Sequence, residues 1–404
     1  MGCDELKKCF SRVRSETLLL CESLEPEDFH LQGMDEVSPP KWHIGHTSWF
    51  FDIFVLKNFE KKWKPVDPNY EYIFNSYYEV LGTPYPRPNR GQIARPLLKD
   101  IYRYQSEVTY RLLELIDQLS SDEGFWPEVR DLIVTGLHHE RQHQELLMMD
   151  IKYNRSIQPI ASRFALSPDL EFDSGPGQNE SDAERLYLFD GGLKSFGCDA
   201  SEEFSYDNER PKHKQWLNPF ALSAQPVSNK EYSEFIEDTG YSSPKWWTSE
   251  GWEWVSRKQI TGPLYWRQES KHGFTEFDMF EYAPLKLNAP VSHLSWLEAE
   301  AFSKWAGKRL PTEYELDVAL IKYPELTRRL WYWTGSAYRP FPGFKPWSGQ
   351  LSEYNGKFMV NQYVLKGGSF MTHPDHFRPA YRNFFGTTNR WQFSGLLLAE
   401  DVGS

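Results

Sequence analysis

Residues 138–147 read HHERQHQELL and lie inside a longer helical pattern from about Pro127 to Tyr153. Within that pattern, small, apolar and imidazole side chains recur at the spacing of one helix face, at Leu132, Gly136, His139, His143, Leu147 and Ile151. Residues at i and i+4 lie one above the other on a helix, so His139 and His143 share that face. The segment therefore predicts a helix that presents two imidazoles to one side.

Three further amphipathic segments precede this helix. They cover residues 5–24, residues 42–59 after the Ser38-Pro39-Pro40 start signal, and Leu97–Leu119. A long loop over about residues 62–96 separates the last two, and loops of that length in a compact domain are usually functional. Four helices with apolar stripes predict an up-down four-helix bundle.

The second half of the sequence has a different character, with short strand patterns and turns rich in Gly, Pro and Trp. Its three helix signals follow the capping residues Ser228, Ser295 and Thr312. Residues 166–186 are rich in Ser, Gly, Pro and acids and predict a linker. We therefore predict an α+β chain, with a helical domain over residues 1–165 and a domain of short strands and few helices over residues 187–404.

Composition narrows the class of function. The chain has 404 residues, 16% of them aromatic, and a net charge of −12, which disfavours nucleic acid and anionic membranes as partners. Its four cysteines form neither a CxxC pair nor a disulfide framework, and no apolar run reaches the ~18 residues of a membrane span. The charged start, MGCDELKKCF, lacks a signal-peptide core. We expect a cytoplasmic protein that binds small molecules; its oligomeric state stays open.

The motif His139-Glu140-Arg141-Gln142-His143 matches the HExxH signature of zinc hydrolases, with Glu140 as general base. No G-x-x-H follows it, and the acids that could supply a third ligand, Asp169 and Glu171, fall in the expected linker. The ordinary structural explanation is a solvated stripe on a charged helix. The motif alone leaves both alternatives open.

A second pair of imidazoles, His43 and His46, lies in the WHIGH segment of another expected bundle helix. His46 and the pair on the last helix would face the same bundle interior, where facing helices build metal sites. Three neutral imidazoles leave up to three positions for a substrate donor, a second donor and O₂, which favours non-haem iron. Zinc with three histidines and a water stays open.

Nine motifs carry a resemblance to a known family, in the family's order from about residue 38 to 400. They are WHIGHTSWFF, FNSYYEVLG followed by PRPNRG, HHERQHQEL, YDNERPKH, PVSNKEY, PVSHLSWLEAEAFSKWAGKRLPTE, YNGKFM, LKGGSF, and RNFF followed by RWQFSGL. Together they resemble the sulfoxide synthases of ergothioneine biosynthesis (EgtB-type). The resemblance implies a DinB-like four-helix domain joined to a formylglycine-generating-enzyme-like domain of C-type lectin fold. It also implies an Fe(II) enzyme that uses O₂ to join a thiol to C2 of the imidazole of Nα-trimethylhistidine (hercynine).

The resemblance assigns roles residue by residue. It implies iron ligands at His46, His139 and His143, contacts to the histidine-derived substrate at Gln142 and Asn383, an active-site phenol at Tyr77 or Tyr78, and binding of the thiol substrate's carboxylate at Arg87 and Arg90. His43 then becomes a neighbour of the metal rather than a ligand. Phe385 stands where some relatives that use γ-glutamylcysteine have an acid, which favours free cysteine as the sulfur donor.

Elementary chemistry agrees with these roles. A guanidinium fork matches a carboxylate bidentately, although a solvated basic turn would also explain Arg87 and Arg90. A phenol beside an O₂ site can donate a proton or a hydrogen atom and so limit plain thiol oxidation. A trimethylammonium group favours aromatic faces, for which we select Phe384 and Trp391, although core packing is the ordinary explanation for each.

Three alternatives stay open from the sequence. The first is a related synthase that makes selenoneine or 5-histidylcysteine sulfoxide. The second is the zinc hydrolase described above. The third is a ligand sensor without enzymatic activity. The formylglycine-generating activity itself is disfavoured, because those enzymes bind copper through cysteines and this half of the chain has only Cys198.

Overall fold

The protein is described by a computed structural model that covers residues 2–120, 122, 124–160, 164–165, 185–199, 204–269 and 273–403. The fold divides into two compact units, residues 1–171 with 348–353 and residues 172–347 with 354–404. The expected linker lies outside the described residues except for Arg185 and Leu186, so the domain boundaries stay predictions. No helix in the described ranges is long and apolar enough to cross a bilayer.

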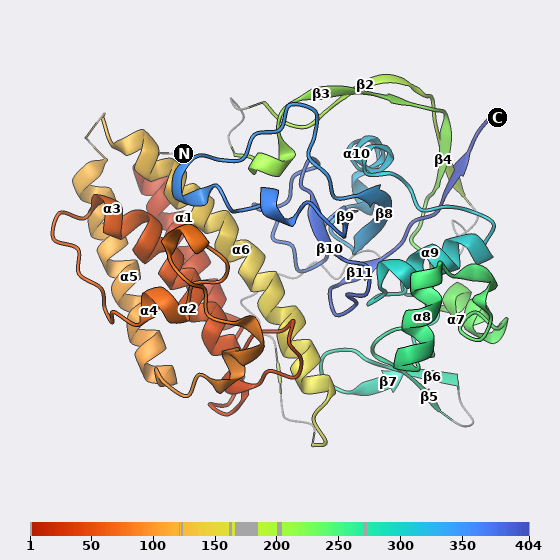
Figure 1. Cartoon of the computed structure of the whole chain (residues 1–404), viewed down its shortest axis with the longest axis horizontal. Coiled ribbons are helices and arrows are strands. Elements are labelled where there is room, and N and C mark those ends of the chain that lie inside the picture. The colour runs from red at the N-terminus through yellow and green to blue at the C-terminus, as the bar shows by residue number, and fades with distance from the viewer. Residues whose placement is uncertain are drawn as a thin grey trace. The chain divides into compact units, whose positions relative to one another are not determined.

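Four long helices build the first unit, as the apolar stripes predicted (Figure 1). They are α1 (Cys3–Leu19), α2 (Pro40–Phe51), α5 (Leu98–Leu119) and α6 (Trp126–Ser156). The first helix was expected to reach residue 24 but ends earlier. Its chain continues in tight turns, in which Cys21 and Glu22 donate to carbonyls three residues back instead of four.

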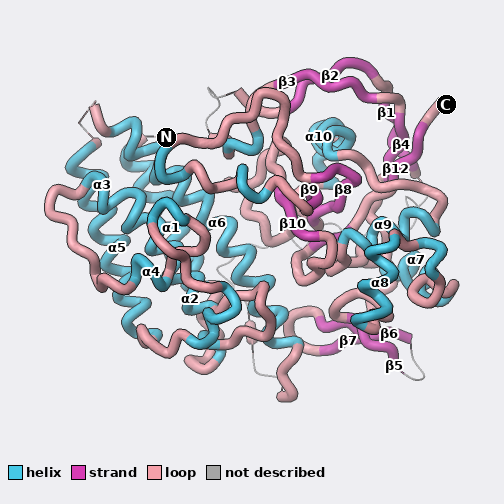
Figure 2. The backbone as a smooth tube through the Cα atoms, viewed as in Figure 1, coloured by secondary structure: helices cyan, strands magenta, loops and turns pink. Residues whose placement is uncertain are grey.

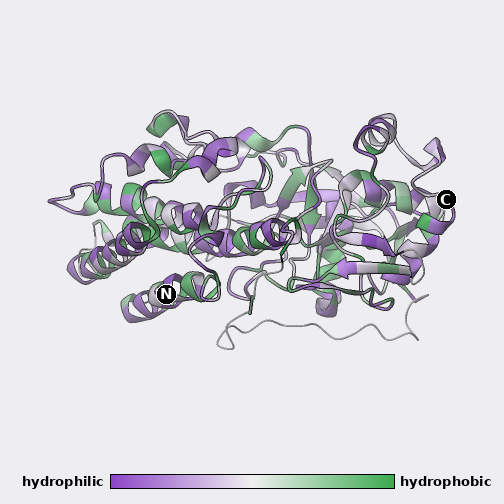
Figure 3. Ribbon diagram, turned by 90° about the horizontal axis from the view of Figure 1, so that it is seen from below, coloured by the Kyte–Doolittle hydropathy of each residue, from purple (hydrophilic) through white to green (hydrophobic). Residues whose placement is uncertain are grey.

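Helix α2 is the central helix of this unit. It packs against both α5 and α6, and every one of its residues is buried. A helix that is surrounded on all sides presents no face to water, so even its polar residues, such as Lys41, Thr47 and Ser48, are buried. Alternation of hydrophobic and hydrophilic residues is visible along the other bundle helices in Figure 3. A π-type turn, η2 (Asp52–Leu56), and α3 (Lys57–Phe59) continue α2, so the helix expected over residues 42–59 is formed and begins two residues earlier, at Pro40.

The expected long loop carries short helical turns rather than a long element. These are α4 (Tyr70–Ile73), η3 (Glu79–Leu81) and η4 (Arg87–Gln92); a further turn, η1 (Asp28–His30), precedes α2. These turns carry two pairs of expected site residues: Tyr77 and Tyr78 directly precede η3, and Arg87 and Arg90 lie in η4.

The second unit is rich in short strands (Figure 2). A four-stranded sheet has the order β10-β9-β8-β11, in which only the β11–β8 pair is parallel. The other strands form a sheet of order β1-β4-β12, the β2–β3 pair and a β5-β6-β7 sheet. Strand bounds are Leu186–Phe189 (β1), Gly192–Phe196 (β2), His213–Leu217 (β3), Phe220–Ser223 (β4), Trp266–Glu269 (β5), Gly273–Phe277 (β6), Tyr282–Pro284 (β7), Trp331–Ala337 (β8), Gln362–Lys366 (β9), Asn383–Gly386 (β10), Ser394–Gly395 (β11) and Ala399–Asp401 (β12).

Three helices of the second unit begin at the expected capping residues, and a fourth was missed. The expected helices are α7 (Asn229–Glu237), α9 (Trp296–Trp305) and α10 (Glu313–Lys322), each with a reciprocal capping box. The prediction of only three helix signals is wrong, because α8 (Ser249–Lys258) follows Thr248, whose hydroxyl accepts from the Gly251 amide. The second unit also contains the short turns η6 (Asp207–Glu209), η7 (Pro244–Trp246), η8 (Pro324–Leu326) and η10 (Gly356–Phe358). A further short turn, η9 (Gly349–Leu351), belongs to the segment that is grouped with the first unit. The α+β fold class is confirmed.

Candidate metal centre

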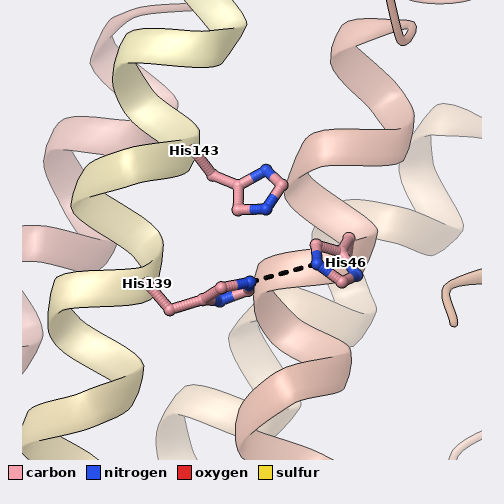
Figure 4. A group of neighbouring side chains, drawn as sticks. All are labelled: His46, His139 and His143. Atoms are coloured by element: carbon pink, nitrogen blue, oxygen red, sulfur yellow. Dashed lines mark hydrogen bonds between the residues drawn. The ribbon is translucent and has the colours of Figure 1, made fainter. Parts of the chain in front are cut away.

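Three imidazoles converge in the interior of the helical bundle. His139 and His143 project from α6 toward His46 on the facing α2 (Figure 4). The ring centroids are 4.9 Å apart for His46 and His139, and each lies 4.6 Å from the centroid of His143. One ring nitrogen from each residue lies within 4.8 Å of the other two. The two-helix juxtaposition expected from the sequence is therefore present.

The donor geometry fits a transition metal. The Nε2 atoms of His46 and His139 lie 3.1 Å apart, and cis ligands at ~2.1 Å from a metal are separated by ~3.0 Å. His46 and His139 are fully or almost fully buried, and His143 is partly buried. A set of three imidazoles without a carboxylate supplies no charge and leaves coordination positions open, which suits Fe(II) as well as other mid-row divalent ions.

Hydrogen bonding and burial keep the three rings ready to bind a metal. The Nδ1 of His46 lies 2.7 Å from the carbonyl oxygen of Phe74. Because a carbonyl only accepts, the proton is assigned to Nδ1, and Nε2 offers its lone pair. Burial lowers the pKa of His139 to about 3, and it lowers the pKa of His46 and of His143 well below the ordinary value. All three rings are therefore neutral at neutral pH.

Glu140 faces away from the three-histidine group. Its carboxylate is fully buried; Oε2 accepts from Nη1 of Arg14 at 2.9 Å, and Oε1 accepts from the hydroxyl of Thr17 at 2.6 Å. Both donors lie on α1. A carboxylate held by two buried donors on another helix is poorly placed to act as a general base at the metal. This geometry disfavours the zinc-hydrolase alternative; Asp169 and Glu171 lie outside the described residues.

Arg90 lies beside the metal centre. It is buried, and its guanidinium carbon lies 3.4 Å from the centroid of the Trp42 ring, which in turn stacks on His46 at 4.5 Å. Its terminal nitrogens donate to the hydroxyls of Ser38 (2.8 Å) and Ser76 (3.1 Å), while Nε has no hydrogen-bond partner in the described part of the chain. A guanidinium keeps its charge, so two hydroxyls leave this buried cation ready for an anionic partner.

Arg87, the other expected arginine, is exposed at the start of η4, where Nη1 donates to the Glu36 carbonyl at 3.4 Å. The two arginines therefore differ in setting, although they share one turn. The side chain of Gln32 holds this turn to the bundle: its Nε2 donates to the Arg87 carbonyl at 2.8 Å, and its Oε1 accepts from the Gly91 amide.

The expected tyrosines lie one aromatic layer from the metal centre. Tyr78 is fully buried and packs 5.8 Å from Trp49, which stacks on His46 at 5.4 Å. Tyr77 is partly buried and stacks on Tyr78, with the two phenol oxygens 3.3 Å apart. The side chain of Asn75 fixes this turn by bonding both the amide and the carbonyl of Tyr78 at 2.9 Å.

The remaining expected site residues occupy both units. Gln142 is partly buried on α6, next to His143 in the sequence. In the second unit, Asn383 begins β10, Phe384 stacks on Tyr338 with centroids 4.1 Å apart, and Trp391 is buried, edge to face with Phe385. Their contacts with substrate stay predictions.

Two residues beside the three-histidine group were not selected as site residues from the sequence. His43 was treated only as a neighbour, and Asp150 was not singled out, yet both lie in contact with each other beside His143. Asp150 follows His143 by seven residues, two helical turns along the same face, and this spacing was the signal available in the sequence.

Comparison with known proteins divides the chain in the same way as the motifs do. Residues 10–147 match the DinB superfamily, and residues 173–322 match the sulfatase-modifying factor enzyme 1-like domain. Each match covers part of the chain, in the order that the motifs predicted.

Relatives that match nearly the whole chain are also found. The chain is 28% identical to a protein named hercynine oxygenase from Mycolicibacterium smegmatis, covering 96% of this chain and 97% of that protein. It is 28% identical to another of that name from Mycobacterium tuberculosis, covering 99% of each. A formylglycine-generating enzyme from Thermomonospora curvata is 28% identical over 40% of this chain and 60% of its own length. The family resemblance predicted from the motifs is confirmed.

Proposed function

We propose that this protein, an oxygenase related over nearly its whole length to the hercynine oxygenases, is a non-haem Fe(II)- and O₂-dependent sulfoxide synthase of ergothioneine biosynthesis. Its reaction forms a C–S bond between the thiol of cysteine, or of γ-glutamylcysteine, and imidazole C2 of Nα-trimethylhistidine. The observation that carries the proposal is the buried group of three neutral imidazoles, His46, His139 and His143. We place the reaction in the cytoplasm, in keeping with the four free cysteines.

The three histidines would hold the metal, which when bound supplies O₂ activation and adjacent positions for a thiolate and an imidazole. The chain's own residues orient the two substrates. Arg90 is the buried cation available for the thiol substrate's carboxylate, with Arg87 on the same turn. Gln142 and Asn383 would hold the histidine-derived substrate, and Phe384 and Trp391 would face its trimethylammonium group. Tyr77 or Tyr78 would hold the proton that directs the outcome toward C–S bond formation.

Product mass spectrometry tests this function directly. The protein is loaded anaerobically with Fe(II), mixed with Nα-trimethylhistidine and cysteine, exposed to O₂, and compared with a parallel reaction containing γ-glutamylcysteine. We expect O₂ consumption only when both substrates are present, and a sulfoxide joined at C2 as the product, with cysteine preferred. Amide hydrolysis by a zinc-loaded form without O₂ would replace this proposal with the hydrolase. Tight substrate binding without turnover for any metal would replace it with the sensor.

Arg90→Lys should weaken use of the thiol substrate selectively. A lysine ammonium keeps the charge but loses the planar fork and its stacking on Trp42, so we expect the KM for cysteine to rise about 10-fold or more while the KM for Nα-trimethylhistidine stays within about 2-fold. Arg87→Lys is the matched control on the same turn, and its exposed side chain should have the smaller effect. Equal increases in both KM values would exclude a selective role for Arg90.

Removing the active-site phenol should change the products rather than the metal. In Tyr77→Phe and Tyr78→Phe the ring stack is preserved and one hydroxyl is lost, so Fe(II) content should stay at the wild-type level. In one of the two variants we expect the ratio of sulfoxide to oxidised thiol to fall by about 100-fold or more, the lower end of the range for general acid–base catalysis. Chromatography of both products measures the ratio. Unchanged ratios in both variants would remove the phenol from the mechanism.

A further inference from the structure

A buried hydrogen-bonded chain leads away from the metal centre on the side of His143. The Nδ1 atoms of His43 and His143 lie 2.9 Å apart, and Nε2 of His43 lies 3.0 Å from Oδ2 of Asp150. Both His43 and Asp150 are only 3% exposed. His43 lies one helical turn before His46 on α2, whereas Asp150 lies on α6 with His143, so the chain crosses between the two helices that supply the metal ligands.

The surroundings of Asp150 determine the direction of the hydrogen bonds. Its Oδ2 also accepts from the backbone N–H of Ser38 at 2.7 Å, so this atom acts as an acceptor toward both neighbours. His43 therefore donates through Nε2. A neutral imidazole carries one proton, so Nδ1 of His43 accepts and Nδ1 of His143 donates to it. The proton on Nδ1 of His143 leaves the lone pair on Nε2.

We propose that His43 and Asp150 are positioning residues that hold His143 in the tautomer and orientation in which its Nε2 can bind the metal. Carboxylates or carbonyls that accept from the second nitrogen of a ligand histidine raise its basicity and fix its ring. Here the carboxylate acts through an intervening imidazole. The inference rests on the metal site of the proposed function.

Ser38 connects this chain to the arginine beside the metal centre. Its backbone amide donates to Asp150, while its hydroxyl accepts from Nη1 of Arg90 at 2.8 Å. One residue, two positions before α2, thus contacts both the carboxylate proposed to orient His143 and the cation proposed to bind the thiol substrate. A change at Asp150 is therefore expected to disturb metal binding first and the KM for cysteine second.

His43→Leu tests the chain by removing both ring nitrogens at similar volume. We expect the affinity for Fe(II), and for Co(II) as a spectroscopic probe, to fall about 10–100-fold in competition with a chromophoric chelator. His43→Asn is the matched variant, since its Oδ1 is as many bonds from Cα as Nδ1 of histidine and can accept from His143. It should recover part of the affinity, because it restores an acceptor for His143 but not the link from residue 43 to Asp150. The Co(II) absorption spectrum should shift in His43→Leu and return toward wild type in His43→Asn.

Two substitutions of Asp150 separate the effect of its charge on metal affinity from the effect of its hydrogen bonds. In Asp150→Asn the Ser38 N–H still requires an oxygen at the same place, so His43 keeps its acceptor and metal affinity should stay within about 5-fold of wild type. In Asp150→Ala the acceptor is lost, and affinity should fall about 10–100-fold. Thermal unfolding of the metal-free proteins separates these effects from a general loss of stability.

The outcomes are distinguishable from failure of the proposed function. If the wild-type protein forms the sulfoxide but His43→Leu and Asp150→Ala bind Fe(II) and Co(II) as tightly as wild type does, the positioning role is wrong and the function stands. Equal losses in His43→Leu and His43→Asn would also overturn it, because acceptance from His143 would then be irrelevant. Selective loss in His43→Leu and Asp150→Ala supports it. A wild-type protein that binds neither metal would overturn the metal centre and this inference together.

Discussion

His139→Ala should bind Fe(II) more than about 100-fold more weakly than the wild-type protein and form no detectable sulfoxide. The substitution removes one of three ligands in a centre that has no carboxylate in the donor set. The Nε2 atoms of His139 and His46 are 3.1 Å apart, and the loss of His139 leaves a site with two ligands, His46 and His143. Metal content after anaerobic loading and desalting measures the effect, together with product formation.

The control for this prediction is His138→Ala. His138 is the adjacent histidine on α6 and lies outside the three-histidine group, so its replacement should leave metal content and turnover close to the wild-type values. Fe(II) should also raise the unfolding temperature of the wild-type and His138→Ala proteins, but not that of His139→Ala, because a ligand stabilises only a folded state that binds it. Full metal content in His139→Ala, or equal loss in both variants, would refute the assignment.

Helix periodicity made the grouping of the three histidines predictable, and the reasons are local. The i, i+4 spacing of His139 and His143 fixes their shared face on any helix, and the long apolar stripes of α5 and α6 define those helices closely. His46 was predicted to face the same bundle interior because it shares one stripe of its helix with the aromatic residues Trp42 and Trp49. Each of these inferences uses only the geometry of one helix and its packing partner.

Contacts between distant segments were not predictable from the same pattern. Glu140 follows His139 directly, and the HExxH motif suggested a shared role, but the 100° step along a helix turns its carboxylate toward Arg14, 126 residues earlier in the chain. Helix α8 was missed because its cap, Thr248, is followed three residues later by Gly251 instead of Glu, so the reciprocal capping box that marks the other three helices of the second unit is absent. Phe384 shows the same limit, since its stacking on Tyr338 depends on strand pairing that no local pattern encodes.

Arg14→Met should lower the free energy of unfolding by about 3–5 kcal/mol, because it leaves the buried carboxylate of Glu140 without its cation. Arg14 is 1% exposed and also donates to the hydroxyls of Thr47 and Ser48, so one side chain on α1 joins α6 to α2. Equilibrium urea unfolding of the metal-free protein measures the change. In the double variant Arg14→Met/Glu140→Leu, apolar packing replaces both charges and should recover part of the loss.

Glu140→Gln then separates this structural role from a catalytic one. The amide keeps a hydrogen-bond acceptor for Arg14 but loses the charge, so stability should fall while the folded protein still binds Fe(II) and forms sulfoxide at a rate within about 10-fold of wild type. A general base would behave differently, since its loss typically costs about 10²–10⁴-fold in rate. Rates normalised to metal content decide between the two. A Glu140→Gln protein that is folded and fully metal-loaded but inactive would place the carboxylate in the chemistry and reverse our assignment of it to the bundle core.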